Sequence, residues 1–504
     1  YLSSESEYYN LEQITDEENK ITKKYFDKVG NLKKEERANG DSILTTLYNY
    51  DNLYRLTSVT SPAGKITSYL YDDLNNISQK TSPDEGTIKY KYDKYGNLRF
   101  SINTASANNL TFNKYDNFNR LILTGEKTFT NPWNDLNPDL DYSTNQGSIS
   151  AFENYSTNQG NFVLVNMYDN YIRTGVFSNL YNFTVGTLEN LKGRLVATAF
   201  RDKTANTWSY KVYSYDYLGR VKDEYVFFQS TSAYKKITNE YDNLGYLIKQ
   251  NVDNQFYTWY GYDEQARLKE VRSNMINAYT TARLEAVYSY DQSDKVLSAK
   301  YGTNGNYAPK VLYTYDSKGR VSDINGIASD LFTTVFQQTL TYYNNDNIHT
   351  MFLRNDGNGS WPNLHFTYSY DNYNRLTSAA CSNSYYTENY TYDDDGNFTH
   401  KERPYNTSQS LTYNYTQPGK NYLMSLTKGG TNYSFTYDYK GTMIFDQRKA
   451  TFGFVYDRRN LPIQFSKAGL SHYYLYNDGG QRIYKQTSSS NKEYNLIDHT
   501  GKEL

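Results

Sequence analysis

The feature that most constrains this chain is a short pattern of Tyr, Asp and Gly that recurs from one end to the other. Its clearest form is TIKYKYDKYGNLRFSI, residues 87–102. Before the turn, Tyr90 and Tyr92 alternate with polar residues, which is the period of a β-strand with one bulky face and one wet face. The alternation resumes after the turn with Leu98 and Phe100. The segment therefore predicts a β-hairpin.

The turn of this unit is specified by side chains. We predict that the Asp93 carboxylate accepts hydrogen bonds from backbone N–H groups two or three residues ahead, and that Gly96 and Asn97 occupy the positions of positive φ. The same reasoning assigns structural turn roles to Asp51, Asp72, Asp93, Gly96, Asp116, Asp216, Gly219, Asp242, Gly245, Asp263, Asp316, Gly319, Asp371, Asp393, Gly396, Asp438, Gly441 and Asp457.

Close copies of the unit fill most of the chain. They cover residues 50–56, 71–77, 115–121, 215–221, 241–247, 262–268, 290–296, 315–321, 370–376, 392–398, 437–443, 456–461 and 476–483, and weaker copies begin at Phe26, Tyr168, Tyr343 and Tyr415. Neighbouring copies lie roughly 20 to 28 residues apart outside one interruption, a period that suits a hairpin and is too short for an independent domain. Since no sustained 3.6-residue apolar period is present, helix should be scarce.

We divide the chain into four segments: hairpins over residues 1–124, an interrupted and elaborated β segment over 125–208, hairpins again over 209–493, and a different terminal segment over 494–504. In the interruption, YSTNQG occurs twice, and residues 162–166, 180–184 and 194–200 are candidate strands. We favour an embellished part of the same sheet, and a separate small domain is the alternative.

One strand is expected to be covered on both sides. Tyr257, Trp259, Tyr260 and Tyr262 place aromatic rings on both of its faces.

The composition agrees with a thin, partly wet sheet. The chain has 58 tyrosines and 38% hydrophobic residues among its 504, and its mean hydropathy is -0.84. A tyrosine ring can pack while its hydroxyl finds water or a partner. Disorder is the rival interpretation, but 17% aromatic residues and a formal charge of -2 are not typical of disordered chains.

Charge and patterning exclude several classes of function. A formal charge of -2 gives no basic field for nucleic acid, so we expect no nucleic-acid partner. No apolar run is long enough to span a bilayer, and the first residues lack a signal peptide. Because the first residue is not Met, we expect that the natural start, with any export signal, lies outside this sequence. The single cysteine, Cys381, excludes an internal disulfide framework and does not settle the compartment.

The recurring string Y-D-x-x-G-[RN]-[LV], with an aromatic two residues before the Tyr, resembles the YD repeat of the Rhs family. The pairs Tyr90/Tyr92, Tyr213/Tyr215, Tyr313/Tyr315, Tyr368/Tyr370 and Tyr390/Tyr392 carry the likeness most clearly. Relatives of this type include Rhs polymorphic toxins, the B and C components of Tc toxins, wall-associated YD-repeat proteins and teneurins. The resemblance implies an all-β fold in which antiparallel hairpins form one continuous strip that spirals into a hollow shell. Winding one turn of the strip against the next would pair its exposed edges.

The terminal segment YNLIDHTGKEL looks like the opening of the segment that follows the repeats in this family. Asp498, His499 and Gly501 match its Asp-His-x-Gly string. In toxin members that segment leads to an autoproteolytic region and a variable toxin, and this sequence contains neither.

No catalytic, cofactor or metal site is predicted. Asp393, Asp394, Asp395, Gly396 and Glu402 match parts of an EF-hand loop, but the stretch is already explained as a turn. The histidines His349, His365, His400, His472 and His499 are scattered without ligand spacing. Carboxylate pairs are abundant because every turn needs an Asp, which argues against a glycosidase.

Rows of tyrosines on neighbouring hairpins have two interpretations. They could stack on sugars, or they could pack across strands, each pair adding about 0.2–1 kcal/mol to the sheet. We favour packing.

The leading hypothesis is a non-enzymatic Rhs-type shell segment, which by resemblance encloses and helps to deliver a C-terminal toxin. Its partners would be that toxin or a delivery component, and it would be secreted or lie on a bacterial cell surface. The alternative is a teneurin-like adhesion protein that binds a surface glycan or protein, and a carbohydrate-active enzyme ranks third.

Overall fold

The computed structural model describes residues 10–39, 42–105, 109–154, 161–170, 186–202, 206–228, 234–302, 308–329, 333–355, 363–415, 417, 419–457, 459–477, 479–487 and 491–504. These residues form 38 β-strands and a few single 3-10 turns, and they include no α-helix. The all-β class and the scarcity of helix are thus confirmed. The predicted strand 180–184 and the second YSTNQG copy lie outside the described residues.

The chain forms two compact units, each built from two stretches of sequence. The first comprises Tyr1–Thr67 and Phe256–Tyr433, and the second comprises Ser68–Gln255 and Ser434–Leu504.

The strands and 3-10 turns have the following bounds. The first unit holds β1 (Asn10–Thr15), β2 (Ile21–Phe26), β3 (Leu32–Asn39), β4 (Ser42–Tyr50), β5 (Leu56–Thr60), β18 (Phe256–Tyr262), β19 (Leu268–Asn274), η4 (Tyr279–Thr281), β20 (Arg283–Tyr290), β21 (Val296–Tyr301), β22 (Lys310–Tyr315), β23 (Val321–Ile327), β24 (Thr334–Tyr342), β25 (Ile348–Asn355), β26 (Leu364–Tyr370), β27 (Leu376–Cys381), η6 (Ser384–Tyr386), β28 (Glu388–Tyr392), β29 (Phe398–Glu402), η7 (Thr407–Gln409), β30 (Leu411–Asn414) and β31 (Ser425–Lys428). The second holds β7 (Ile77–Ser82), β8 (Gly86–Tyr92), β9 (Leu98–Asn103), β10 (Asn109–Tyr115), β11 (Leu121–Thr128), η1 (Trp133–Asp135), β12 (Phe162–Tyr168), β13 (Leu195–Asp202), β14 (Thr207–Tyr215), β15 (Val221–Phe227), β16 (Tyr234–Tyr241), β17 (Leu247–Val252), β33 (Met443–Asp446), β34 (Thr451–Tyr456), β35 (Pro462–Lys467), β36 (Leu470–Tyr476), β37 (Arg482–Gln486) and β38 (Lys492–Tyr494). Two strands, β6 (Ile66–Tyr71) and β32 (Thr431–Tyr437), contain the unit boundaries.

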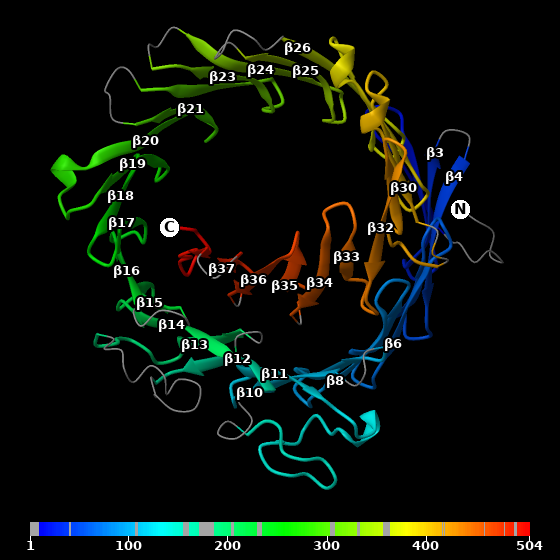
Figure 1. The fold of residues 1–504 in the computed structure, drawn as a ribbon, viewed down its shortest axis with the longest axis vertical. Helices are drawn as coiled ribbons and strands as arrows, with labels where there is room; N and C mark the ends of the chain where they lie inside the picture. Colours follow the sequence, from blue (N-terminus) through cyan, green and yellow to red (C-terminus); the bar gives the residue numbers. More distant parts are fainter. Residues whose placement is uncertain are drawn as a thin grey trace. The chain divides into compact units, whose positions relative to one another are not determined.

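Within each unit, consecutive strands pair antiparallel, as for β23 to β26, which lie side by side in Figure 1. In the hairpin of β8 and β9, Tyr90 faces Ser101, and the register shifts by one residue between Lys91 and Tyr92. The same shift precedes the turn of β4–β5, β10–β11 and β26–β27. A one-residue bulge at this place is typical of a hairpin whose turn ends in a left-handed residue.

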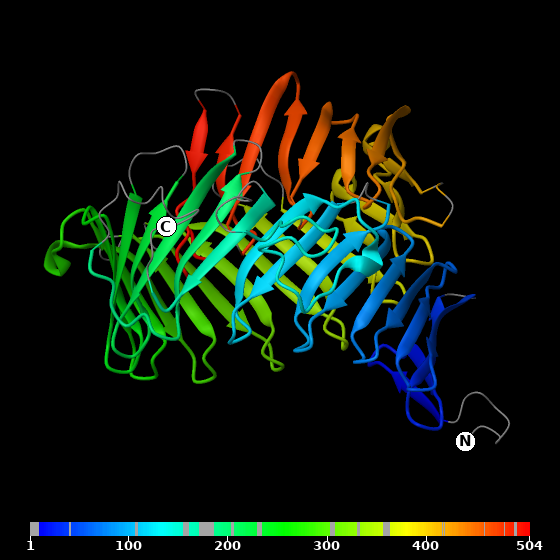
Figure 2. The ribbon, with the colours of Figure 1, turned by 90° about the horizontal axis from the view of Figure 1, so that it is seen from below.

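Two kinds of connection alternate along the strip. The Tyr-Asp turns, here called corners, join β4 to β5, β6 to β7, β8 to β9 and their successors, whereas the intervening connections, here called links, join β5 to β6 and β7 to β8. Because alternate turns of an antiparallel strip lie on opposite edges, each strip has a corner edge and a link edge. Figure 2 shows the strands from the side.

The interrupted segment belongs to the strip. Strands β11, β12, β13 and β14 pair in chain order. One elaboration fills the link between β11 and β12, and the other lies inside a corner. There the N–H of Asp169 donates to the carbonyl of Arg194 over 3.1 Å, although residues 170–193 intervene. The Gly193 N–H donates to the Asp169 carboxylate over 2.6 Å.

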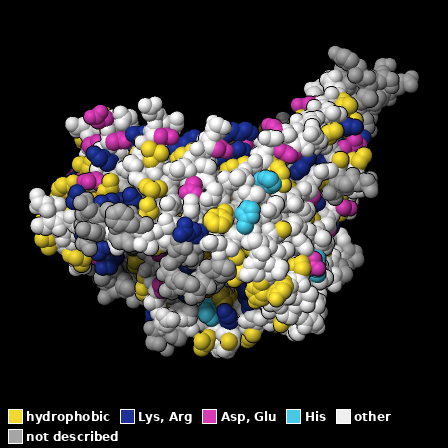
Figure 3. Space-filling model, turned by 90° about the horizontal axis from the view of Figure 1, so that it is seen from above, with side chains coloured by type: hydrophobic (Ala, Val, Ile, Leu, Met, Phe, Trp, Pro, Cys, Tyr) yellow, Lys and Arg dark blue, Asp and Glu magenta, His cyan; other side chains and the backbone are white. Residues whose placement is uncertain are grey.

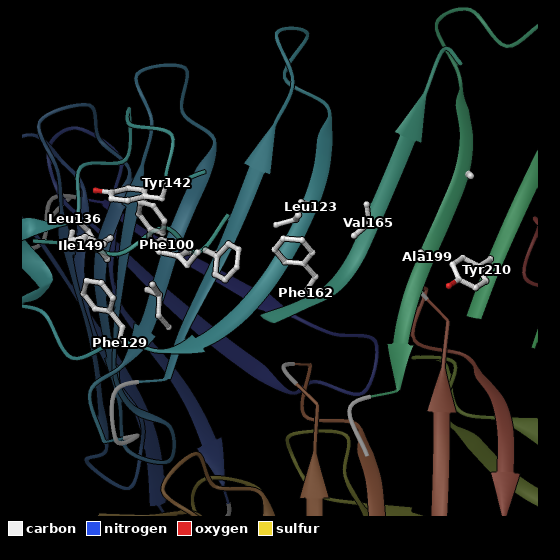
Figure 4. Packing of buried hydrophobic residues seen from close by; sticks show 14 of the residues in the cluster. Phe100, Leu123, Phe129, Leu136, Tyr142, Ile149, Phe162, Val165, Ala199 and Tyr210 are labelled. Atoms are coloured by element: carbon white, nitrogen blue, oxygen red, sulfur yellow. The ribbon is translucent and has the colours of Figure 1, made fainter. Parts of the chain in front are cut away.

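The elaborated link builds a core on one face of β9 to β15. Phe100, Phe112, Tyr142, Phe152 and Phe162 are all fully buried in it. The rings of Tyr142 and Phe152 stack at 5.0 Å, and Phe112 meets Phe152 edge-on at 4.9 Å. Figure 4 shows this cluster, which extends across the sheet to Ala199 and Tyr210. The added link thus supplies the apolar cover that a thin strip lacks.

The strand most completely covered on both sides is β14. Residues 209–215 are all buried, with Tyr210 and Val212 in the first cluster. On the opposite face, a second cluster joins Val226 and Phe228 to Ile483 and Ile497 of the C-terminal region. The expectation that β18 would be covered on both sides was wrong: Tyr257 is buried, but Trp259, Tyr260 and Tyr262 are half-exposed. Both the elaborated link and the C-terminal region pack on β14 and its neighbours instead.

Candidate functional site

The repeated corner is the most strongly specified feature of the chain. The N–H of Asp93 donates to the carbonyl of Asn97, and the N–H of Gly96 donates to the carbonyl of Asp93, each over 2.9 Å. One carboxylate oxygen of Asp93 accepts the N–H groups of Tyr95 and Asn97, both at 2.9 Å. The partners lie two and four residues ahead, so the prediction of two or three was partly wrong.

Only one residue of the corner has positive φ. Gly96 has φ of 83°, and the prediction that Asn97 shares this conformation was wrong. Asn97 immediately precedes the return strand β9, and its amide donates to the second carboxylate oxygen of Asp93 over 2.9 Å. A single left-handed residue is enough, because the bulge completes the reversal.

The same geometry recurs at the other predicted corners. Each predicted Asp accepts the N–H four residues ahead, donated by Arg55, Asn76, Asn97, Arg120, Arg220, Tyr246, Arg267, Arg320, Arg375, Asn397, Thr442 and Leu461. The residue three places after Asp is left-handed in every case, namely Tyr54, Asn75, Gly96, Asn119, Gly219, Gly245, Ala266, Gly319, Asn374, Gly396, Gly441 and Asn460.

In twelve copies of the repeat, the tyrosine of the motif ties its hairpin to the one before it. Tyr290 Oη donates to the carbonyl of Leu268 over 2.6 Å, and Leu268 is the first residue of the preceding return strand. Equivalent bonds join Tyr50 to Leu32, Tyr115 to Leu98, Tyr168 to Leu121, Tyr215 to Leu195, Tyr241 to Val221, Tyr315 to Val296, Tyr342 to Val321, Tyr370 to Ile348, Tyr392 to Leu376, Tyr456 to Met443 and Tyr476 to Pro462. Sequence reasoning gave these rings a packing role and missed their hydrogen bonds.

The arginine after the left-handed residue links two corners. Arg267 Nε donates to its own Asp263 over 2.7 Å, and its Nη1 donates to the carbonyl of Asp291 in the next corner over 2.9 Å. Its guanidinium also lies 4.7 Å from the centre of the Tyr290 ring. Arg220, Arg320 and Arg375 do the same toward Tyr241, Tyr342 and Tyr392. The recurring [RN] of the motif was the available signal for this role.

The contacts of the corners shift the pKa values of their Asp and Tyr side chains. The backbone hydrogen bond from Arg55 is the first cause that lowers the pKa of Asp51. At Asp116, burial opposes the charge, but hydrogen bonds from Arg120 outweigh it and lower the pKa. Burial raises the pKa of Tyr215 and of Tyr456 to about 12. The corners therefore favour charged Asp and neutral Tyr.

The terminal Asp-His-x-Gly string forms another corner. The N–H of Asp498 donates to the carbonyl of Lys502 over 2.9 Å, and the Gly501 N–H donates to that of Asp498 over 3.1 Å. The Asp498 carboxylate accepts the N–H groups of Thr500 and Lys502. Gly501 has φ of 86°. This equivalence was missed, although the spacing from Asp498 to Gly501 equals that from Asp93 to Gly96.

This C-terminal corner is docked on the faces of β14, β15 and β17. Lys211 Nζ donates to the carbonyl of Ile497 over 2.9 Å and lies 2.8 Å from Glu224, whose side chain is fully buried. Gln250 donates to the Asp498 carboxylate over 3.2 Å. His499 Nδ1 lies 3.7 Å from Glu224. A buried ion pair thus holds the corner in place.

The acidic stretch that resembles an EF-hand is occupied by structural contacts. Asp395 pairs with Lys65 at 2.9 Å, Asp393 binds Asn397, and Glu402 accepts the amide of Asn389. Across the described residues, His, Cys, Asp and Glu form no cluster able to hold a metal ion.

Four of the histidines lie on four separate strands. His349 packs against the Tyr343 ring at 4.4 Å between centroids, and His472 stacks on Phe465 at 4.8 Å. His400 contacts the Thr412 hydroxyl, and His365 lies in β26.

The known proteins that match this chain support the YD-repeat interpretation of its corners. The family described as Teneurin YD-shell matches residues 8–150. A solved structure of the Photorhabdus luminescens Tc holotoxin pore, with the mutation TccC3-D651A, matches with a TM-score of 0.66 at 17% identity over 94% of this chain and 23% of that chain. The TcdB2-TccC3 structure matches with a TM-score of 0.64 at 15% identity over 94% of this chain and 24% of that chain.

These findings confirm the predicted resemblance to YD-repeat proteins, and the chain has the fold of the Tc toxin structures. It spans about a quarter of the length of the chains it matches. Among curated proteins, none matches the sequence. In the described part of the chain, no helix combines the length and the apolar character needed to cross a membrane.

Proposed function

We propose that this chain is a non-enzymatic wall segment that encloses a polypeptide joined to its C-terminus and helps to deliver it outside the producing cell, the enclosed polypeptide being a toxin. No metal or cofactor takes part. The corners stiffen the strip, because their hydrogen bonds join residues within one corner or in neighbouring hairpins of the same strip.

The observation that carries this proposal is the fold shared with the Tc toxin structures over 94% of the chain. The position of the C-terminal corner supports it. Asp498 and Ile497 are buried, and the corner is anchored to β14 and β17 rather than projecting from an end of the strip. A polypeptide that continues from Leu504 would start beside a sheet face.

A protease-protection experiment tests enclosure. A cassette with a specific protease site and a short unfolded reporter is joined to Leu504 of the full chain, and cleavage is followed over time. An enclosed cassette should be cut at least about tenfold more slowly than the same cassette joined before Tyr1, because proteases need an accessible flexible segment. Equal rates at the two ends would contradict enclosure.

The alternative is a surface adhesion protein that binds a glycan or a protein. The match of residues 8–150 to Teneurin YD-shell favours it. The sequence beyond Leu504 separates the two candidates: a cleavage region followed by a variable domain supports the toxin wall, and a surface anchor supports adhesion.

A further inference from the structure

Three lysines of the sheet contact the elaborated link between β11 and β12, and they differ in what they meet there. Lys91 of β8 donates a hydrogen bond to the carbonyl of Leu136. Lys114 of β10 pairs with the carboxylate of Asp141 at 2.8 Å. Both ammonium groups therefore have an oxygen acceptor in the link. Lys127 of β11 is the third lysine, and the link offers it no such acceptor.

The amine of Lys127 lies against aromatic rings. Its Nζ is 4.7 Å from the centre of the Phe152 ring and 6.0 Å from that of the Phe129 ring. Both rings belong to the buried cluster, in which Figure 4 labels Phe129. Across the strand pair, Lys127 faces Leu110, which is fully buried. In the described part of the chain, Lys127 Nζ makes no hydrogen bond and no ion pair.

The acidic residues closest to Lys127 in the sequence and in the buried cluster point away from it or pair elsewhere. Glu126 precedes Lys127 in β11, so strand alternation places its side chain on the opposite face, where it lines a pocket with Lys440. Glu153 of the elaborated link is buried and pairs with Arg99 at 2.9 Å. Neither carboxylate therefore supports a positive charge on Lys127.

Other lysines of the second unit show the more usual arrangement. Lys222 pairs with Glu189 at 3.0 Å, and Lys235 pairs with Asp253 at 2.6 Å. The face drawn in Figure 3 likewise mixes basic and acidic side chains. Lys127 is set apart from these lysines because aromatic rings take the place of the carboxylate.

Two effects act on the amine of Lys127. The faces of phenyl rings attract an ammonium group, although less strongly than an indole does. Removal from water disfavours the ammonium group, and no acceptor compensates for the lost water. The loss of water is the larger effect, and burial lowers the pKa of Lys127. At Lys91, burial also lowers the pKa, but the charge of Asp135 opposes it, and the hydrogen bond to Leu136 favours the charged form.

We propose that Lys127 is the preferred acylation site among the lysines of this chain, and that it takes an acyl group from an activated donor, namely a thioester or an acyl phosphate. The neutral amine is the nucleophile. Its nitrogen attacks the acyl carbonyl carbon, the amide C–N bond forms, and the bond to sulfur or to the phosphate oxygen breaks. The thiolate or phosphate leaves, and solvent takes the proton that the amine loses. Lys127 is half-buried and its Nζ still reaches the surface, so a small donor has access. The proposal is independent of what the strip encloses.

Competitive acetylation of the full chain tests the proposal. A trace of isotopically heavy acetyl phosphate is added to the folded protein, the remaining amines are acetylated with a light reagent after denaturation, and mass spectrometry gives the heavy fraction at each lysine. Lys127 should carry at least about fivefold more heavy label than Lys91 or Lys318, whose side chain is 50% exposed. When the heavy reagent is added in denaturant, the three should be labelled equally, because the rings no longer surround the amine. A label at Lys127 in the folded protein that does not exceed the label at Lys318 would overturn the proposal.

A matched pair of variants tests the role of the missing carboxylate. Phe129→Glu places an anion beside the amine, and Phe129→Gln places a neutral side chain of the same size there. The Glu variant should lower the label at Lys127 to the level of Lys318, because a nearby carboxylate favours the ammonium form, whereas the Gln variant should retain more of it. Circular dichroism checks that both variants are folded. Equal labels at Lys127 in the two folded variants would overturn the proposal, and if either variant does not fold, the comparison of the folded and denatured unaltered chain decides.

Discussion

The phenol of Tyr241 donates a hydrogen bond to the carbonyl of Val221 over 3.0 Å, so the tyrosine of one corner holds the return strand of the preceding hairpin. The two residues belong to adjacent copies of the repeat. A strip with few deeply buried side chains thus gains continuity from one bond that recurs in twelve copies of the repeat.

Removing one such bond should weaken the strip locally. In Tyr290→Phe, the carbonyl of Leu268 loses a partner that lies at 2.6 Å, and the free energy of unfolding should fall by about 1 kcal/mol. Chemical denaturation followed by circular dichroism measures the change. The control is Tyr217→Phe, because the Tyr217 side chain is 78% exposed at a corner tip. Equal effects of the two substitutions would show that the phenol bond is not stabilising.

Gly125, which lies inside a strand, should not tolerate a side chain. A Cβ added to Gly125 would lie 2.1 Å from the Phe112 ring. Gly125→Ala should therefore destabilise the protein by about 1–3 kcal/mol through overpacking. Phe112→Leu in the same chain should recover part of the loss by making room, and denaturation of both variants measures it. An additive loss in the double variant would contradict the steric explanation.

The buried ion pair below the C-terminal corner should be sensitive to single but not to paired replacement. Lys211→Met leaves the carboxylate of Glu224 buried without its cation and should cost about 3–5 kcal/mol. Lys211→Met with Glu224→Leu removes both charges and should cost much less. Hydrogen exchange of residues 494–504 should rise in the single variant. Exchange in the single variant that equals exchange in the unaltered protein would show that the pair does not hold the corner.

Acid should loosen the corners. The pKa values of Asp51 and Asp116 are lowered in the folded chain below the ordinary value of 3.8. The unfolded chain binds protons first as the pH falls, so the stabilisation is complete above about pH 4 and is lost as the pH passes through the lower folded values. Hydrogen exchange of corner amides at pH 6 and pH 3 measures this. Asp116→Asn should lose part of that pH dependence, and unaltered dependence would contradict the assignment.

High pH should destabilise the folded protein through ionisation of a buried tyrosine. Burial raises the pKa of Tyr215 to about 12. Since the ordinary value is about 10, the unfolded chain loses this proton first, and the contribution to stability is complete below about pH 10 and is lost toward pH 12. Absorbance of tyrosinate against pH, with and without Tyr215→Phe, measures the group. Titration of Tyr215 near pH 10 in the folded protein would contradict the burial argument.

The sequence was sufficient for the fold class and for the corner positions, because the corner is local. Asp93 and Gly96 act within one turn, and alternation of Tyr90 and Tyr92 specifies the strand before it. The hydrogen bond from Tyr290 to Leu268 joins residues of different repeats, and a single hairpin gives no sign of it.

Long-range packing was the part that could not be predicted. The C-terminal corner lies on β14 through Lys211 and Ile497, far apart in sequence, and no periodicity reports which strand receives it. For the same reason the aromatic residues of β18 gave a wrong expectation of double cover. The burial of a strand depends on which distant segments pack on it. Two such segments, the elaborated link and the C-terminal region, pack on β14 and its neighbours.

The corner at Asp169 has a practical consequence. Its Asp and its Gly-Arg pair close the turn with bonds across the two ends of a long insertion, so the strands β12 and β13 remain paired whatever lies between. Each ordinary corner presents the same two ends side by side. A foreign polypeptide with neighbouring termini should thus be accepted between Asp and Gly of other repeats, which makes the array a scaffold for displaying grafted domains at regular intervals.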